Sequence, residues 1–236
     1  MNGRLYCVGV GPGDGELMTV KAVRILEQVP VIAAVHTDTN SLSAALTAAA
    51  QIIDVSGKRT VLLEIPMTRK TAAVNQAYQA AAKALTAILD QGLDTALITL
   101  GDPALYSTAA RIMAYISPEQ YEVHIVPGVA SFCAAAACAG QSLVSRSEVL
   151  TVIPAGTDMQ KLKKLLERSG TKVIMKPASQ LAQVISLLAD MQLLPYCTLV
   201  QNCGMEGERI LRSSDMLLAA ESDEQPYFSL FIVRER

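Results

Sequence analysis

The sequence predicts an α/β protein of two domains, residues 1–127 and 128–236, the first built on a mostly parallel five-stranded sheet and the second on a mixed sheet. Short apolar runs alternate with longer amphipathic segments, which is typical of strand and helix units in a largely parallel sheet. At 236 residues, 51% of them hydrophobic, the chain can bury a substantial core. The pattern changes after Pro127, and this change places the domain boundary.

Five short apolar runs define the strands of the first domain. They are Leu5–Gly9, Val31–Ala34, Val61–Ile65, Thr95–Leu100 and Val123–Val126. Between the third and fourth runs, the segment from Thr71 to Gln91 carries apolar side chains every three or four residues and stops before Gly92, as expected of an amphipathic helix. We expect this helix to cover one face of the sheet.

The second domain begins with an alanine-rich helix and then returns to strands. The helices expected are Ser131–Ala139, Met159–Arg168 and Ala178–Met191. The strands expected are Val149–Ile153, Lys172–Met175, Thr198–Gln201, Arg209–Leu211 and Tyr227–Val233. Because a single short helix separates the last two strands, we expect the sheet to be mixed.

Composition argues against several classes of protein. With 20 basic and 22 acidic residues the formal charge is -2, so no global positive field exists to hold nucleic acid or an anionic membrane. The five cysteines include no C-x-x-C pair, which argues against a disulfide framework and against a zinc site. The N-terminus lacks the pattern of a signal peptide, and Pro127 and Gly140 interrupt the uncharged segment 123–145, which favours a strand, turn and helix over a membrane span. We therefore expect a cytoplasmic protein whose cysteines are reduced and mostly buried, without nucleic acid or membrane partners.

The stretch GVGPGD, Gly9 to Asp14, follows the first strand. Asp14 stands where a dinucleotide-binding fingerprint needs a glycine, and the G-K-S/T ending of a phosphate loop is missing. What remains is a glycine turn at the carboxyl end of a strand, where a ligand can approach the backbone closely. Pro12 has no backbone N–H, so the turn has one hydrogen-bond donor fewer at that position. A plain strand-to-helix turn is an equally good interpretation of this motif alone.

The stretch GDP, Gly101 to Pro103, follows the fourth strand. Asp102 suits the N-cap of a helix and Pro103 its first residue, because proline lacks the amide that would go unpaired there. The functional alternative adds that Gly101 lets a ligand reach the strand end, while the Asp102 carboxylate accepts from a ribose hydroxyl or faces a cation. Two such turns in one sheet favour one shared crevice.

Two further segments follow strands in the same way. PGVASF, Pro127 to Phe132, puts small residues and free amides at the start of a helix, which suits a polar ligand. Arg69 and Lys70 follow the third strand and are either solvated or close to an acidic substrate. The two histidines lie far apart without a carboxylate pattern, so neither histidine acid–base catalysis nor metal binding is indicated, and no catalytic residue is identified.

Taken in order, four stretches resemble the tetrapyrrole methyltransferase family, whose members use S-adenosylmethionine to methylate corrin and sirohaem precursors. The stretches are VGVGPGDGELMTVKA, LGDPALYST, PGVASFCAAAACAG and PYFSLFIV, and together they cover nearly the whole chain. IPMTR at Ile65–Arg69, with GDPALYST and PYFSLFIV, is most similar to the branch that methylates C-20 of precorrin-2 or cobalt-factor II in cobalamin (vitamin B12) biosynthesis. Gly15, where proline is usual, and Lys70, where an acidic residue is usual, depart from that branch.

The resemblance implies a homodimer in which S-adenosyl-L-methionine binds in a cleft between the two α/β domains and leaves as S-adenosyl-L-homocysteine. The positions expected to contact the cofactor are Pro12, Gly101, Asp102, Leu105, Ser107, Ala130, Ser131, Met175, Lys176, Asn202, Cys203 and Gly204. Those expected to contact the tetrapyrrole, precorrin-2 or cobalt-factor II, are Arg69, Lys70 and Tyr106. Arg146 and Lys176 are further candidates for its carboxylates.

The implied reaction is a direct displacement at an activated sulfonium methyl. It needs little acid or base, so the protein contributes mainly alignment and exclusion of water, worth about 7–11 kcal/mol in favourable cases. Three alternatives stay open. They are action at a different ring carbon, for example on uroporphyrinogen III or precorrin-4; methylation of RNA ribose, which the absence of a basic face disfavours; and a non-catalytic S-adenosylmethionine-binding regulator.

Overall fold

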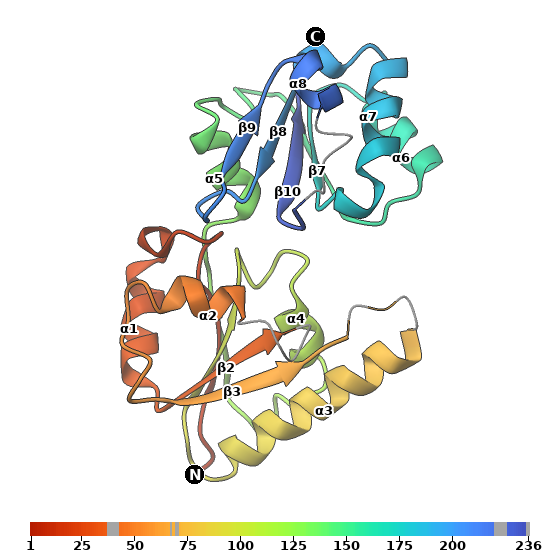
Figure 1. Cartoon of the computed structure of the whole chain (residues 1–236). Coiled ribbons are helices and arrows are strands. Elements are labelled where there is room, and N and C mark those ends of the chain that lie inside the picture. The colour runs from red at the N-terminus through yellow and green to blue at the C-terminus, as the bar shows by residue number, and fades with distance from the viewer. Residues whose placement is uncertain (37–42, 67, 69–70, 220–225, 235–236) are drawn as a thin grey trace. The chain divides into compact units, whose positions relative to one another are not determined.

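The computed structural model describes residues 1–36, 43–66, 68, 71–219 and 226–234 (Figure 1). The chain divides into two compact units, Met1–Ser131 and Phe132–Arg236, whereas the predicted boundary fell after Pro127. Each unit contains one five-stranded sheet. The expected combination of a parallel and a mixed α/β sheet is confirmed.

The sheet of the first unit is parallel throughout. Its strands are β1 (Leu5–Gly9), β2 (Val31–His36), β3 (Arg59–Glu64), β4 (Thr95–Thr99) and β5 (Val123–Val126), and their order across the sheet is β3-β2-β4-β1-β5. Leu5 of β1 aligns with Thr95 of β4 and with Val123 of β5. The segments that follow these three strands therefore leave the sheet at the same edge.

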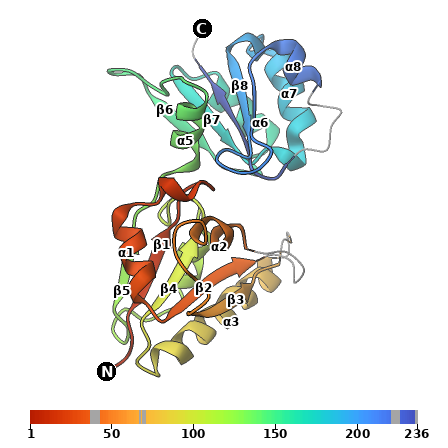
Figure 2. The ribbon, with the colours of Figure 1, turned by 60° about the vertical axis from the view of Figure 1, so that its left-hand side comes forward.

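Helices pack on both faces of this sheet (Figure 2). They are α1 (Val20–Gln28), α2 (Ala44–Ala49), α3 (Thr71–Leu89) and α4 (Thr108–Met113). Leu26 of α1 packs in one core cluster with Val8, and Leu85 of α3 packs in another with Cys7. Neighbouring residues of β1 are buried in different clusters, so both faces of the strand are buried. This is why its sequence is a continuous apolar run. The helix predicted from Thr71 is confirmed.

The sheet of the second unit is mixed, as predicted. Its strands are β6 (Leu150–Ile153), β7 (Thr171–Met175), β8 (Cys197–Gln201), β9 (Arg209–Leu211) and β10 (Ser229–Val233), in the order β6-β7-β10-β8-β9. β6 and β7 are parallel, while β10 is antiparallel to both β7 and β8. The carboxyl ends of β7 and β8 consequently flank the start of β10.

Four α-helices follow in this part of the described chain. They are α5 (Ser131–Cys138), α6 (Met159–Leu166), α7 (Leu181–Asp190) and α8 (Ser214–Ala219). Three of them, α6, α7 and α8, bury side chains in one core cluster with this sheet. Phe231 of β10 is fully buried in a cluster with Leu162 of α6 and Ile185 of α7. The single helix predicted over 178–191 is instead a 3-10 turn at Ala178–Gln180 followed by α7.

Segment 123–145, which is long and uncharged enough to span a bilayer, contains β5 and α5, as predicted. Among the described residues, no helix has both the length and the apolar character needed to cross a membrane.

Candidate functional site

Three strand-end turns of the first unit meet at the carboxyl edge of its sheet. They follow β1, β4 and β5, which are neighbours in the sheet, and this is the edge where open α/β sheets bind ligands. The Gly101 amide donates to the Gly11 carbonyl at 2.7 Å, so the turns after β4 and β1 are paired directly. The two turns that sequence reasoning placed together are therefore in contact.

Gly9 and Gly128 let these turns pack backbone against backbone. A Cβ atom on Gly128 would lie 2.2 Å from the Gly101 carbonyl oxygen, and a Cβ on Gly9 would lie 2.5 Å from the same oxygen. No real side chain tolerates either approach. Sequence reasoning placed both glycines in the strand-end turns but did not predict this contact, because the motif letters do not show which backbones touch.

Gly101 itself is required by its backbone conformation. Its φ of 71° lies in the left-handed region, where other residues are strained. A Cβ there would meet no atom closer than the Ser131 amide nitrogen at 3.9 Å, so the side of Gly101 that faces the start of α5 has room. Ligand approach at Gly101 stays a prediction, and this open side is where it would occur.

Asp102 does not cap a helix, so that interpretation of GDP is wrong. One carboxylate oxygen accepts from the Ala104 amide at 2.8 Å, which closes a local turn, and the other accepts from the Gly128 amide at 2.9 Å. The helix begins only at Thr108, where the Ser107 hydroxyl is the N-cap and accepts from the amide of Ala109. Asp102 thus connects the turn after β4 to the turn after β5.

Other predicted residues of the first unit lie in the same turns. Pro12 is buried, whereas Leu105 and Tyr106 are 41% and 58% exposed. Tyr106 has a φ of 48°, which is strained for an aromatic residue. The Ser107 hydroxyl also lies 3.3 Å from the Thr99 hydroxyl at the end of β4, so the segment after Asp102 is fixed at both ends.

Ala130 and Ser131 are half-buried at the start of α5. By helix geometry, the first amides of α5 have no carbonyl partner inside the helix. Of these amides, that of Ser131 lies on the open side of Gly101.

The predicted residues of the second unit gather on both sides of the start of β10. Lys176 follows β7 and donates its amide to the Ser229 carbonyl at 2.8 Å, while Asn202 follows β8 and donates to the Phe228 carbonyl at 2.7 Å. Both adopt left-handed φ values, 49° and 50°. The Lys176 ammonium donates to the Tyr227 hydroxyl at 3.2 Å and lies 4.8 Å from that ring's centroid.

The remaining predicted residues of this unit adjoin these two turns. Met175 ends β7 and lines a small recess with Pro154 and Pro177. Gly204 has a φ of 71° and donates its amide to Glu208 at 2.9 Å. Cys203 lies between Asn202 and Gly204, and its thiol is 3.3 Å from that of Cys138. This proximity was missed, since the two cysteines are far apart in sequence.

None of the five cysteines forms a disulfide, and they differ in burial. Cys7 and Cys197 are buried, and burial raises the pKa of each from 9.0 to about 12, so neither is a nucleophile at neutral pH. Cys133 and Cys138 are exposed and Cys203 is buried. The expectation of mostly buried thiols holds for three of the five.

The histidine prediction needs one correction. His124 does have a carboxylate partner, because its Nε2 lies 2.7 Å from Glu122 and its ring stacks on Tyr6 at 5.1 Å between centroids. Glu122 and His124 are exposed and precede the end of β5, so they form a surface pair and not part of the strand-end turns. Arg69 and Lys70 lie outside the described residues.

Comparison with known proteins identifies what these turns belong to. Residues 4–214 match the family model for tetrapyrrole (corrin/porphyrin) methylases. The chain is 32% identical to the cobalt-precorrin-2 C(20)-methyltransferase of Salmonella typhimurium, over 100% of this chain and 98% of that protein.

Two solved structures have a similar fold. One is a cobalt precorrin-4 methyltransferase, with a TM-score of 0.73 and 21% identity over 98% of this chain and 94% of that chain. The other is the uroporphyrin-III C-methyl transferase from Thermus thermophilus complexed with S-adenyl homocysteine, with a TM-score of 0.68 and 21% identity over 99% of this chain and 98% of that chain.

Proposed function

Since the chain belongs to the tetrapyrrole (corrin/porphyrin) methylase family of C-methyltransferases, we propose that it transfers a methyl group from S-adenosyl-L-methionine to C-20 of precorrin-2 or cobalt-factor II in cobalamin biosynthesis. The observation that carries the ring position is the full-length identity of 32% with the Salmonella enzyme named for that reaction. A different ring carbon is the alternative.

The strand-end turns of the first unit are suited to hold the cofactor. The open side of Gly101 faces the Ser131 amide, and the backbone donors at the start of α5 suit a ligand with carboxylate and hydroxyl oxygens. The Asp102 carboxylate uses one acceptor position on each oxygen, which leaves others for a ribose hydroxyl. In the second unit, Met175, Lys176 and the segment from Asn202 to Gly204 are the candidates.

The chain's own contribution is binding, orientation and exclusion of water. Bound S-adenosylmethionine supplies a methyl group already activated on a sulfonium, so no strong acid or base has to be provided. Leu105 and Tyr106 expose apolar surface directly after Asp102, which suits a flat macrocycle. Arg69 is proposed, from the sequence alone, to bind a tetrapyrrole carboxylate with its two-pronged guanidinium.

Incubation with S-adenosylmethionine and each candidate tetrapyrrole tests this proposal. Precorrin-2 and cobalt-factor II should each be tried beside uroporphyrinogen III and precorrin-4, with mass spectrometry for one added methyl group and NMR of a labelled methyl to locate it. A methyl on C-20 supports the proposal. Methylation only of the other two substrates would overturn the ring position, and binding of S-adenosylhomocysteine without any methylation would favour a regulator.

A homodimer and a cytoplasmic location remain part of the proposal. Light scattering of the purified protein gives its mass in solution, and the mass of a monomer across the working concentration range would refute the dimer.

A further inference from the structure

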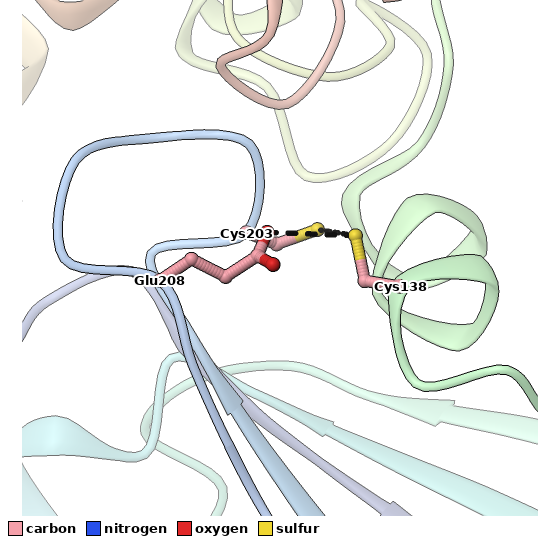
Figure 3. Close-up of side chains that lie close together, drawn as sticks. All are labelled: Cys138, Cys203 and Glu208. Atoms are coloured by element: carbon pink, nitrogen blue, oxygen red, sulfur yellow. Dashed lines mark hydrogen bonds between the residues drawn. The ribbon is translucent and has the colours of Figure 1, made fainter.

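Two thiols and a carboxylate converge in the second unit, and one of the thiols, Cys203, belongs to the segment proposed to contact the cofactor. Cys138 is the last residue of α5, Cys203 follows β8, and Glu208 precedes β9 (Figure 3). The Cys138 and Cys203 sulfurs are 3.3 Å apart, and the Cys138 sulfur is 3.5 Å from Glu208 Oε2. One ligand atom from each of the three residues lies within 4.8 Å of the others.

Two of these three separations, both from the Cys138 sulfur, are close to those of a metal site, and the third is at most 4.8 Å. A tetrahedral ion about 2.3 Å from each sulfur and about 2.1 Å from the carboxylate oxygen needs the sulfurs about 3.8 Å apart and each sulfur about 3.6 Å from the oxygen. The observed 3.3 Å and 3.5 Å differ from these by about half an ångström or less. A disulfide would instead need the sulfurs to close to about 2.05 Å, a larger change.

The carboxylate is already oriented toward the thiols. The Gly204 amide donates to Glu208 Oε2 at 2.9 Å, and ligating carboxylates are commonly held in this way by a hydrogen bond from outside the ligand set. The turn that carries Cys203 is also closed on itself, because the Met205 amide donates to the Asn202 carbonyl at 2.8 Å. Cys203 is 9% exposed, so its thiol is held in the protein interior. Cys138 is exposed, so an ion from solvent can reach the cluster at this residue.

We propose that Cys138, Cys203 and Glu208 bind one divalent cation of the zinc class, with a fourth position open to water. Two thiolates and one carboxylate favour a borderline ion such as Zn²⁺ over Mg²⁺ or Ca²⁺. Binding converts both thiols to thiolates and releases two protons to solvent, so affinity rises with pH. Metal binding needs neither cofactor nor tetrapyrrole, so it can be tested separately from methyl transfer, although Cys203 belongs to the segment proposed to contact the cofactor.

Co²⁺ and Zn²⁺ are the probes for this site. The full chain, reduced and freed of metal by a chelator, is titrated with Co²⁺ and followed by its thiolate-to-cobalt charge-transfer absorption, and then with Zn²⁺ in competition. We expect one ion per chain and displacement of Co²⁺ by Zn²⁺. Cys138→Ser and Cys203→Ser should each weaken Zn²⁺ binding at least about 100-fold, and Glu208→Gln about 10-fold or more.

Cys133→Ser is the matched control, because Cys133 is an exposed thiol on the same helix and is not part of the cluster. It should bind Zn²⁺ like the parent. Circular dichroism and thermal unfolding establish that each variant folds, and the exposed Glu208 gives a usable variant if a cysteine variant does not.

Three results would each overturn the site. The first is a reduced protein that shows no charge-transfer absorption and takes up no Zn²⁺ at micromolar concentration. The second is Zn²⁺ affinity unchanged in Cys138→Ser and Cys203→Ser. The third is mass spectrometry that finds a Cys138–Cys203 disulfide in the isolated protein together with no metal uptake after reduction.

Discussion

Replacement of Asp102 separates two roles for its carboxylate. In the structure the two oxygens accept from the Ala104 and Gly128 amides at 2.8 and 2.9 Å, so the side chain connects two strand-end turns. A hydrogen bond to a charged group contributes about 1.5–3 kcal/mol, and the Ala104 bond is exposed, so water partly replaces it. Asp102→Ala should therefore lower the unfolding free energy of the first unit by about 2–4 kcal/mol.

Asp102→Asn should cost less, about 1–2 kcal/mol, because its single amide oxygen can accept from one of the two amides. Asp54→Asn is the matched control. The Asp54 carboxylate accepts from the Ser56 amide and hydroxyl at 2.9 and 2.6 Å, within its own turn, and connects no second strand-end turn. The free energy of unfolding of Asp54→Asn should differ little from that of the parent protein.

Urea unfolding and calorimetric titration with S-adenosylhomocysteine check these values. If Asp102 positions the turn at Gly128, binding should fall about tenfold or more as stability falls, and Asp54→Asn should bind normally. Loss of binding with unchanged stability would mean that the carboxylate contacts the cofactor and does not hold Gly128. Loss of stability with unchanged binding would refute the assignment of these turns to the cofactor.

Three further expectations follow from the geometry and the sequence. Gly128→Ala would place a Cβ 2.2 Å from the Gly101 carbonyl oxygen, whereas Gly101→Ala would only put an alanine in a left-handed backbone conformation, at a cost of about 1–2 kcal/mol. Gly128→Ala should therefore lower the urea midpoint more than Gly101→Ala. The reverse order would contradict the close packing of the turns. Arg69→Ala should weaken tetrapyrrole binding by about 1.5–3 kcal/mol in a titration and leave S-adenosylhomocysteine binding unchanged, and normal tetrapyrrole binding would make Arg69 a solvated residue. Burial raises the pKa of Cys7 and of Cys197 from 9.0 to about 12, so the unfolded chain loses these protons at lower pH than the folded chain. The free energy of unfolding, measured in urea titrations, should therefore fall between pH 9.0 and about 12. A free energy that stays level over this range would contradict the burial of the two thiols.

The sequence indicated most strands correctly because burial on both sheet faces leaves a visible apolar run. It gave no bounds for α4, whose six residues bury only Ala109 and Ile112 and so show little periodicity. It placed a helix start at Pro103 because local rules favour Asp102 as a cap there. The Asp102 carboxylate instead accepts from Gly128, a contact across sequence that no local rule contains.

In the candidate site, the local sequence predicts where the turns are, but only the folded sheet determines which of them touch. The glycine turns were predicted at the correct strand ends, since a glycine after an apolar run is a local signal. That the Gly9 and Gly128 backbones touch the Gly101 carbonyl follows from the position of β1 between β4 and β5, and that order is a property of the folded sheet. The convergence of Cys138 and Cys203, 65 residues apart, is likewise invisible to spacing rules for metal sites.

Backbone strain at the predicted residues indicates that these turns are shaped before a ligand arrives. Of the five non-glycine residues with left-handed φ in the described chain, Tyr106, Lys176 and Asn202 are predicted site residues, and Arg146 is a further candidate for the tetrapyrrole carboxylates. Each costs about 1–2 kcal/mol and persists only where its surroundings fix it, as the carbonyls of Phe228 and Ser229 do for the two residues beside β10. Because the methyl donor is already activated, the rate of such a reaction depends mainly on how well donor and acceptor are aligned. Turns that are rigid before the ligand binds provide this alignment.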